Sequence, residues 1–246
     1  MTDIPIYVIS VKTFTDRHQH IEEMANRFGF RFEYIFDFDV DDLGSFGGRH
    51  ICPSLRPASI SNVLKHLEAV RKTAFGESEF ALILEDDVVL FDDFFRRLDD
   101  VRAMLPTLKP GWLIFLGGAD NKIDQAIAQS VDFELVKHPI TTAEAYLIDR
   151  AGCQLREQWL LGNTIDCQAD HQLKKMDQAL GIQHYWVTRP MATQGSITGK
   201  FKTALDHSRS KRSAVFLQIK YQWNCLRRQA LPRWVAKLMR VVKGRN

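Results

Sequence analysis

Short apolar runs alternate with stretches of helical periodicity along this sequence, and that alternation restricts the fold more than any other feature. Strands are predicted at residues 4–10, 30–36, 80–84, 112–116, 144–149 and 184–187. Helices are predicted from a cap at Asp16 to Gly29, from a cap at Ser59 onward, and at residues 92–104, 151–161 and 166–180. Strands that alternate with helices predict an α/β fold with a mostly parallel sheet.

Charge is distributed unevenly over the 246 residues, although the formal net charge is only +3. Residues 200–246 hold thirteen Lys and Arg side chains and one acid, Asp206, whereas residues 1–199 have a net charge of about −9. We therefore predict a catalytic or binding domain at residues 1–199 and a basic tail at residues 200–246 that has an anionic partner.

Several classes of protein are disfavoured by what the sequence lacks. No apolar run approaches the ~18 residues that span a bilayer, and the N-terminal segment is predicted to be a strand rather than a signal peptide. The four cysteines are far apart and form no CxxC pair, so we expect reduced thiols in a cytoplasmic protein, without disulfides or structural zinc. GxGxxG, GxSxG and HExxH motifs are missing, and GSITGKF at residues 195–201 is one residue too short for a P-loop.

Three adjacent carboxylates follow the predicted strand at residues 80–84. Glu85, Asp86 and Asp87 would repel one another, and burial would make their charged forms less favourable still. Ligands of open α/β sheets bind at the carboxyl ends of strands, where carboxylate oxygens make a hard site for Mg²⁺ or Mn²⁺ that is shared with substrate phosphates. The cluster therefore predicts a metal–phosphate site. The alternative is that two carboxylates face solvent and one caps the helix near Asp92.

Seven segments, in order along the chain, resemble motifs of one enzyme family. They are IYVISVKTFTDR (6–17), ASISNVLKHLEAV (58–70), ALILEDDVVLFDDF (81–94), PGWLIFLGG (110–118), TTAEAYLIDRAGCQL (141–155), NTIDCQ (163–168) and RPMATQGSI (189–197). Together they are similar to glycosyltransferase family 25, the lipopolysaccharide-type β-glycosyltransferases, over roughly residues 4–197. The chain departs from the family's pattern at Ser61, Asn62 and Lys65, and no glycine follows Asp39.

The resemblance implies a GT-A-like nucleotide-sugar-binding fold and a reaction. A sugar would move from a nucleotide-sugar, such as UDP-galactose, with inversion at the anomeric carbon. The implied acceptor is a lipid-linked oligosaccharide of the lipopolysaccharide or lipooligosaccharide type. A divalent ion, Mn²⁺ or Mg²⁺, would stabilise the charge of the leaving nucleotide, and a carboxylate would take the proton of the acceptor hydroxyl.

The resemblance also assigns roles to individual residues. Glu85, Asp86 and Asp87 are expected to hold the metal and the diphosphate. Asp166 is the preferred general base, with Asp170 one helical turn further along as the second candidate; alternatively, Asp166 caps a helix and Asp170 is solvated. The remaining residues expected to contact the donor are Ser10, Arg17, His66, Gln194 and Ser196. Each of these five has a purely structural alternative: a strand-end hydroxyl, a solvated arginine, a core histidine and two turn residues.

An apolar stripe at helical spacing runs through the basic tail. Lys and Arg are interleaved with it, and its members are Phe216, Ile219, Trp223, Leu226, Trp234, Leu238, Val241 and Val242. The pattern is typical of a helix that lies in an anionic membrane surface, and it predicts a peripheral protein at the cytoplasmic face of the inner membrane. The alternative is a helix packed on the domain with solvated basic residues. Nucleic acid is not expected as a partner, because no RNA- or DNA-binding module accompanies the charge.

The sequence thus favours a metal-dependent inverting glycosyltransferase, and two other classes stay open. A Mg²⁺-dependent phosphohydrolase would use Asp86 and Asp87, but it would also need a nucleophilic Asp in a DxD-type loop and a Lys against the phosphoryl group, and no clear pair is present. A non-catalytic peripheral membrane protein would bind membranes through the tail and have no affinity for nucleotides.

Overall fold

The computed structural model of the protein describes residues 4–44, 48–137, 142–202 and 212–243. The described strands are β1 (Ile6–Ile9), β2 (Glu33–Ile35), β3 (His50–Ile51), β4 (Phe80–Glu85), β5 (Val88–Leu90), β6 (Trp112–Phe115), β7 (Leu135–Val136), β8 (Ala145–Asp149), β9 (Thr164–Ile165), β10 (Gln183–Val187) and β11 (Ala192–Gln194). The described α-helices are α1 (Thr15–Phe28), α2 (Pro57–Phe75), α3 (Phe94–Met104), α4 (Gln125–Gln129), α5 (Arg150–Leu160), α6 (Ala169–Leu180), α7 (Gly195–Thr198), α9 (Ala214–Cys225) and α10 (Leu231–Lys243). A π-helical turn, Leu226–Ala230, joins α9 to α10.

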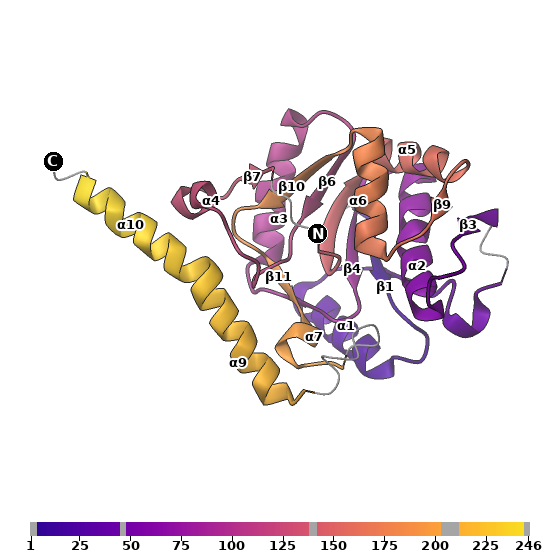
Figure 1. Ribbon diagram of the computed structural model, residues 1–246, viewed down its shortest axis with the longest axis horizontal. Helices are drawn as coiled ribbons and strands as arrows, with labels where there is room; N and C mark the ends of the chain where they lie inside the picture. The colour runs from indigo at the N-terminus through magenta and orange to yellow at the C-terminus, as the bar shows by residue number, and fades with distance from the viewer. Residues whose placement is uncertain (1–3, 45–47, 138–141, 203–211, 244–246) are drawn as a thin grey trace.

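Seven of the strands form one sheet in the order β2-β1-β4-β8-β6-β10-β7 (Figure 1). β2, β1, β4, β6 and β10 run in one direction, and β8 and β7 run against them. The predicted α/β class with a mostly parallel sheet is therefore confirmed. The reversed strand β8, inserted between β4 and β6, is not revealed by the sequence pattern, because an apolar run has the same composition in either direction.

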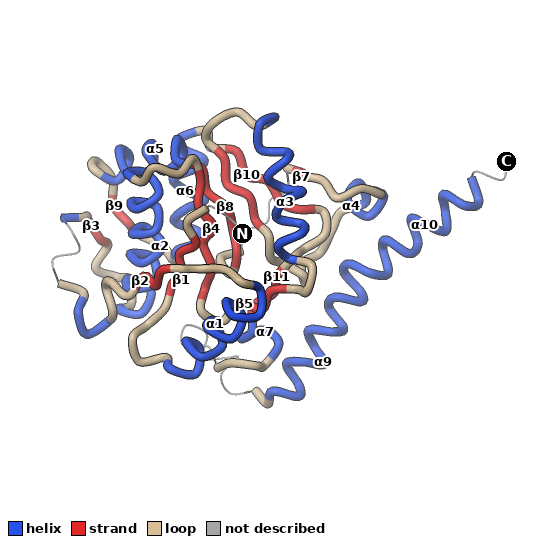
Figure 2. The backbone as a smooth tube through the Cα atoms, turned by 180° about the vertical axis from the view of Figure 1, so that it is seen from behind, coloured by secondary structure: helices blue, strands red, loops and turns tan. Residues whose placement is uncertain are grey.

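Apolar side chains of the sheet alternate between two cores. Along β4, Ala81 and Ile83 belong to the core beneath α2, α5 and α6, whereas Leu82 and Leu84 belong to the core beneath α1 and α3. Helices accordingly cover both faces of the sheet (Figure 2). A strand buried on both faces has to be apolar at every position, which explains the unbroken run at the start of the carboxylate motif.

Two helix starts differ from the sequence-based expectation. α2 begins at Pro57, two residues before the predicted cap Ser59, because proline has no amide hydrogen to satisfy and its fixed φ suits the first helical position. α6 begins at Ala169, so Asp166, which was expected to start or cap this helix, lies in the segment before it. Gly29 ends α1 as predicted, with a left-handed φ of 70°.

The carboxyl ends of β1 and β4 meet at one edge of the sheet, where Ile9 is paired with Glu85. A second strand pair crosses this edge: β5 follows Asp87 directly and pairs with β11, which places Gln194 opposite Val88. The segments after β1, β4 and β11 therefore converge, at the kind of position where α/β sheets bind ligands.

The C-terminal segment is a long helix that stands beside the body (Figure 1). α9, the π-helical turn and α10 follow one another without interruption, so the predicted helical tail is confirmed as a helix. The tail boundary predicted at residue 200 falls within the body, because Lys200 still donates to His20 Nδ1 at 2.9 Å; residues 203–211 lie outside the described part of the chain. In that described part, no helix combines the length and apolar character needed to cross a bilayer.

Candidate active site

A cavity of about 310 Å³ lies where β1, β4 and β11 end. Seven of the ten residues selected from the sequence line it: Ser10, Arg17, Glu85, Asp86, Asp87, Gln194 and Ser196. The other described lining residues are Ile9, Val11, Thr13, Phe14, Asp39, Val40, Asp41, Ala58, Ser61, Asn62 and Lys65. Most of the residues of the predicted donor site therefore lie close together in space, although they range from Ser10 to Ser196 along the sequence.

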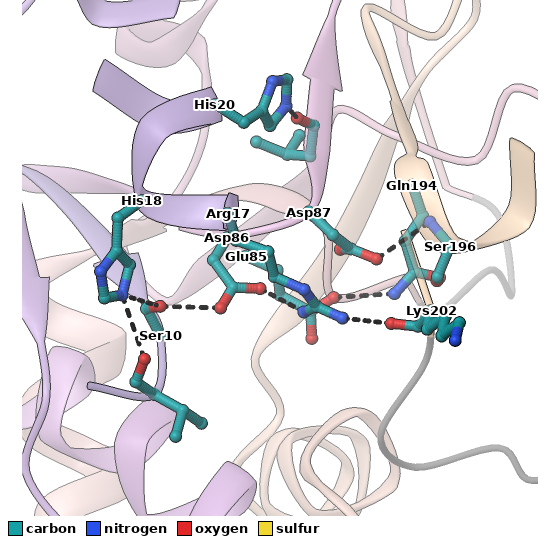
Figure 3. Close-up of polar contacts among 12 residues, drawn as sticks. Ser10, Arg17, His18, His20, Glu85, Asp86, Asp87, Gln194, Ser196 and Lys202 are labelled. Carbon is teal, nitrogen blue, oxygen red and sulfur yellow. Dashed lines mark hydrogen bonds and ion pairs between the residues drawn. The ribbon is translucent and has the colours of Figure 1, made fainter. Parts of the chain in front are cut away.

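Asp86 is the centre of a chain of polar contacts (Figure 3). Ser10 donates to Asp86 Oδ2 at 2.7 Å, and the guanidinium of Arg17 contacts Asp86 Oδ1 at 2.5 Å. Arg17 also donates to the carbonyl oxygen of Lys202 at 2.5 Å, and His18 Nε2 lies 3.0 Å from Ser10 Oγ. One buried carboxylate thereby links the end of β1, the first turn of α1 and the segment after α7.

Asp87 fixes the segment that follows β11. Its backbone carbonyl accepts from Gly195 N at 2.6 Å, and its Oδ2 accepts from Ser196 N at 3.1 Å. A Cβ at Gly195 would lie 2.7 Å from that same carbonyl, so the close approach requires glycine. Asp87 Oδ1 accepts no hydrogen bond from any residue of the described ranges, which leaves one carboxylate oxygen available to a ligand.

Glu85 lies between Gln194 and His66. Gln194 Nε2 donates to Glu85 Oε2 at 3.0 Å, whereas His66 Nε2 lies 3.5 Å from Glu85 Oε1 and has no hydrogen-bond partner among the described residues. His66 is fully buried, and its Nδ1 is hydrogen-bonded to the Tyr146 hydroxyl at 2.7 Å. The structure therefore places His66 behind Glu85, and the direct contact with the donor expected from the sequence stays a prediction.

The described lining of the cavity is negatively charged. It contains five carboxylates but only two cationic side chains, Arg17 and Lys65. Burial, with a further contribution from Glu85, raises the pKa of Asp87 to about 7. Burial also raises the pKa of Asp86, although Arg17 opposes this. Positive charge from a ligand would relieve this excess, because a cation favours the ionised form of each carboxylate.

Glu144, directly before β8, is a buried acid behind the cavity that no sequence motif marks. Its Oε1 accepts from Gly118 N at 2.6 Å. A Cβ at Gly117 would lie 2.1 Å from the same oxygen, so the Gly-Gly pair after β6 makes room for this carboxylate. Burial raises the pKa of Glu144 to about 7. Two features of the sequence could have identified Glu144 together. One is an acid directly before the apolar run at residues 145–149, and the other is the glycine pair that follows the strand at residues 112–116.

The opposite wall of the cavity comes from α2 and from the loop after β2. Lys65 Nζ lies 2.7 Å from Asp39 Oδ1 and donates to the carbonyl of Asp37 at 2.7 Å. Ser61 and Asn62 lie on the same wall. Sequence reasoning did not select Ser61, Asn62 or Lys65 as site residues, because their place on this wall depends on how α2 packs beside the ends of β1 and β4.

Asp166 and Asp170 are not among the described residues that line the cavity. Asp166 is exposed, and its contact with Lys175 Nζ at 2.5 Å lowers its pKa. It follows β9, whose Ile165 carbonyl accepts from Cys52 N at 2.8 Å in the loop that leads into α2. Asp170 lies in the first turn of α6. Asp166 thus lies outside the described lining of the cavity, and the general-base role of either residue stays a prediction.

The described residues contain no group of three or more His, Cys, Asp and Glu side chains arranged to hold a metal ion. Their donor chemistry suits a hard cation, because the cavity has an excess of carboxylate oxygens and Asp87 Oδ1 has no described donor. Both oxygens of Asp86 are already engaged by Ser10 and Arg17, so Glu85 and Asp87 fit such an ion better. One or two carboxylates combined with substrate phosphates are the usual ligands of Mg²⁺.

Comparison with known proteins gives a fold-level likeness only. Neither the family models nor the curated proteins match the sequence. Among solved structures, the chain is similar to the galactosyltransferase LgtC in complex with donor and acceptor sugar analogues, with 10% identity, a TM-score of 0.42, and coverage of 90% of this chain and 95% of that one. It is also similar to an active-site mutant of LgtC (10% identity, TM-score 0.41, 88% and 96% covered). A third similar structure is the inositol-1-phosphate CTP transferase from T. maritima (9% identity, TM-score 0.37, 89% and 77% covered). Similarity at this level carries no argument about function, and membership of family 25 stays a prediction.

Proposed function

We propose that this chain transfers a sugar from a nucleotide-sugar to a saccharide acceptor. The observation that carries the proposal is that three adjacent carboxylates and the guanidinium of Arg17 line one cavity at the carboxyl ends of β1 and β4. Ligands of α/β sheets bind at such an edge. A nucleotide diphosphate needs compensating positive charge, and a carboxylate-held cation together with an arginine is one chemical means of supplying it.

Arg17 is the residue best suited to the diphosphate. Burial lowers its pKa, but the carboxylates of Asp86 and Asp87 outweigh that effect and raise the pKa above its ordinary value, so the guanidinium stays charged. Its planar fork of donors matches phosphate oxygens. Asp86, which Ser10 holds in turn, and the carbonyl of Lys202 fix the orientation of this fork before a ligand arrives, which reduces the entropy lost on binding.

Glu85 and Asp87 are the proposed ligands of Mn²⁺ or Mg²⁺. When bound, the cation would stabilise the negative charge that develops on the departing nucleotide. Gln194 holds Glu85, and the backbone amide of Ser196 holds Asp87. Such outer contacts orient the ligand side chains and tune their affinity for metal.

The finer parts of the proposal rest on the motif resemblance: a UDP-linked donor, an acceptor of the lipopolysaccharide or lipooligosaccharide type, and inversion at the anomeric carbon. In an inverting reaction a general base takes the proton of the acceptor hydroxyl as that hydroxyl attacks. Asp166 is the proposed base. Its contact with Lys175 lowers its pKa, which keeps Asp166 ionised, as a group that accepts a proton has to be.

The direct test is a thermal-shift and calorimetric screen of UDP-, GDP-, CMP- and dTDP-sugars, each with and without Mn²⁺. We expect a UDP-sugar to raise the unfolding temperature only when the cation is present, because binding to the native state alone stabilises it. Asp87→Asn should lose this response. Asp92→Asn is the matched control, because Asp92 is an exposed carboxylate whose side chain pairs with Arg27.

Two results would overturn the proposal. One is that no nucleotide-sugar stabilises the protein with or without the cation. The other is that the protein releases phosphate from a phosphomonoester in a reaction that requires Asp86 and Mg²⁺, which would identify the phosphohydrolase alternative.

A further inference from the structure

Polar side chains hold the helix formed by α9 and α10 on the body. Asn224 donates to Asp120 Oδ2 at 3.3 Å, and Gln229 donates to the carbonyl of Asn121 at 2.9 Å. Arg233 donates to the backbone carbonyls of Ile127 in α4 and of Thr188 after β10. These contacts are directed and mostly reach backbone acceptors, so the helix is docked in one orientation.

The opposite face of the same helix is apolar and exposed. Val215, Ile219, Trp223, Trp234, Leu238 and Val242 are prominent on it, with 58% of Trp223 and 61% of Trp234 accessible. An amphipathic helix on a globular body normally buries its apolar face and exposes its polar one. Here Leu217 and Ala236 are buried, but most of the large apolar side chains of the helix face away from the body. A contiguous exposed apolar surface of this kind marks an interaction site.

The π-helical turn keeps the two faces continuous along the helix. Eighteen residues complete five α-helical turns, so two positions nineteen apart would be about 100° out of phase in an unbroken α-helix. A π-turn accommodates one extra residue, and it therefore returns Leu217 and Ala236, both buried, to the same face. The same interval joins three pairs of exposed apolar residues: Val215 with Trp234, Ile219 with Leu238, and Trp223 with Val242.

Charge decides what kind of partner fits this face. Residues 212–243 contain eight Lys and Arg and no Asp or Glu. A second copy of the chain would bring like charges together around the apolar contact, which is unfavourable. A nucleic acid would satisfy the charge but would offer nothing for the exposed Trp, Leu and Val side chains. An anionic bilayer satisfies both, because its headgroups attract Lys and Arg and its interface accepts apolar side chains.

We propose that the outer face of α9–α10, the face that carries Trp223 and Trp234, lies in the interface of a bilayer that contains anionic lipids. The body is attached to the other side of the helix and is held at a fixed angle to the membrane by Asn224, Gln229 and Arg233. The surface is separate from the cavity, so this proposal holds whether or not the cavity binds a nucleotide-sugar.

The test is sedimentation of the full-length protein with vesicles of phosphatidylcholine, alone or mixed with phosphatidylglycerol. We expect binding that rises with the anionic lipid. Replacing both Trp223 and Trp234 by Ser should weaken it at least about tenfold, because two large apolar side chains leave the interface. The matched control is the pair Phe75→Ser and Leu161→Ser, since these side chains are 74% and 82% exposed on the body; it should bind like the unaltered protein.

A second measurement needs no variant. Lipids brominated along their acyl chains should quench the exposed tryptophans of the wild-type protein, whereas Trp112 and Trp186 are buried in the body and should not be quenched. Equal binding to neutral and anionic vesicles would overturn the proposal, as would a Trp223/Trp234 variant that binds like wild type. Two further results would also overturn it in a wild-type protein that does not bind vesicles. One is a dimer that the Trp223/Trp234 variant no longer forms, and the other is binding to duplex DNA.

Discussion

The cavity holds buried negative charge, whereas the helix α9–α10 carries exposed positive charge. In the cavity, Asp86 and Asp87 are 4% and 3% exposed, and burial raises both of their pKa values. On the helix, Lys220, Arg227, Lys237 and Arg240 are exposed to water beside exposed apolar residues. Salt screens exposed charges beyond about 10 Å at 0.1 M but screens buried ones much less. The cavity should therefore respond to cations and protons, and the helix to ionic strength and lipid.

The largest effect is expected at Asp166, and it tests whether the chemistry extends beyond the cavity. Asp166→Asn should lower kcat by ~10²–10⁴-fold and leave donor affinity unchanged, because a general base acts in the transition state. Steady-state kinetics with a saccharide acceptor, together with calorimetry of the donor, measure this. Asp170→Asn, one helical turn along, should keep most of its turnover. If Asp170→Asn or the cavity variant Asp41→Asn shows the loss instead, the base is that residue.

The second expectation is the independence of the two regions. Asp87→Asn should lower kcat/KM by about 10²-fold or more, since it removes a charge from the proposed cation site. The unfolding temperature should not fall, because burial already disfavours the ionised carboxylate. Vesicle binding should match that of wild type. A loss of both activities in a folded protein would break the comparison, because the cavity and the helix would then be coupled.

The third expectation is a pH dependence that belongs to the body alone. The pKa of Glu144 is about 7 in the fold against an ordinary value of 4.5, so folding takes up a proton between these pH values. The unfolded state binds fewer protons there, so the free energy of unfolding falls as pH rises, by up to about 1.4 kcal/mol per pH unit from this group. Denaturant unfolding across that window should show a flatter dependence for Glu144→Gln. Parallel curves for the two proteins would contradict the assignment.

The smallest expected effect is that of one exposed charge on the helix. Lys237→Gln should weaken binding to anionic vesicles about fivefold, because each basic residue near such a surface contributes about 1 kcal/mol. Lys109→Gln, an exposed lysine of the body, is the control and should have no effect. Raising the ionic strength should reduce the difference between Lys237→Gln and wild type, since the charge is in water. A difference that persists at high salt would mean that Lys237 acts through packing instead.

Features that are local in the sequence could be predicted, and they include the central part of the site. The apolar run of β4 and the carboxylates Glu85 to Asp87 are adjacent along the chain, so strand and site are read together from one stretch. Arg17 follows β1 closely, which places it near the same edge. The direction of β8 could not be predicted, because an apolar run has the same composition in either direction. The short strands β3, β5, β7, β9 and β11 could not be predicted either, because two or three residues show no periodicity.

Contacts between distant segments could not be predicted from one sequence. Lys65 pairs with Asp39, and Glu144 accepts from Gly118, across elements whose relative placement only the fold determines. The register of β5 against β11 is of the same kind, since it brings Gln194 to Glu85 from more than a hundred residues away. The tail shows the same limit: its apolar spacing indicated a helix, but only the fold shows that the helix is docked by its polar side.

Because of the π-helical turn between α9 and α10, the two faces of the tail depend on the number of its residues as well as on their types. Gain of one further residue within Leu226–Ala230, in a helix that keeps a single π-turn, would rotate everything after it by about 100°. Ala236 would leave its buried position, and Trp234 and Leu238 would turn away from the line of Ile219. Loss of one residue there would instead leave an unbroken α-helix in which Leu217 and Ala236 stand eighteen residues apart and on the same face. A one-residue gap at this point in an alignment would therefore preserve both faces, whereas a one-residue insertion would mark a tail that no longer works in the same way.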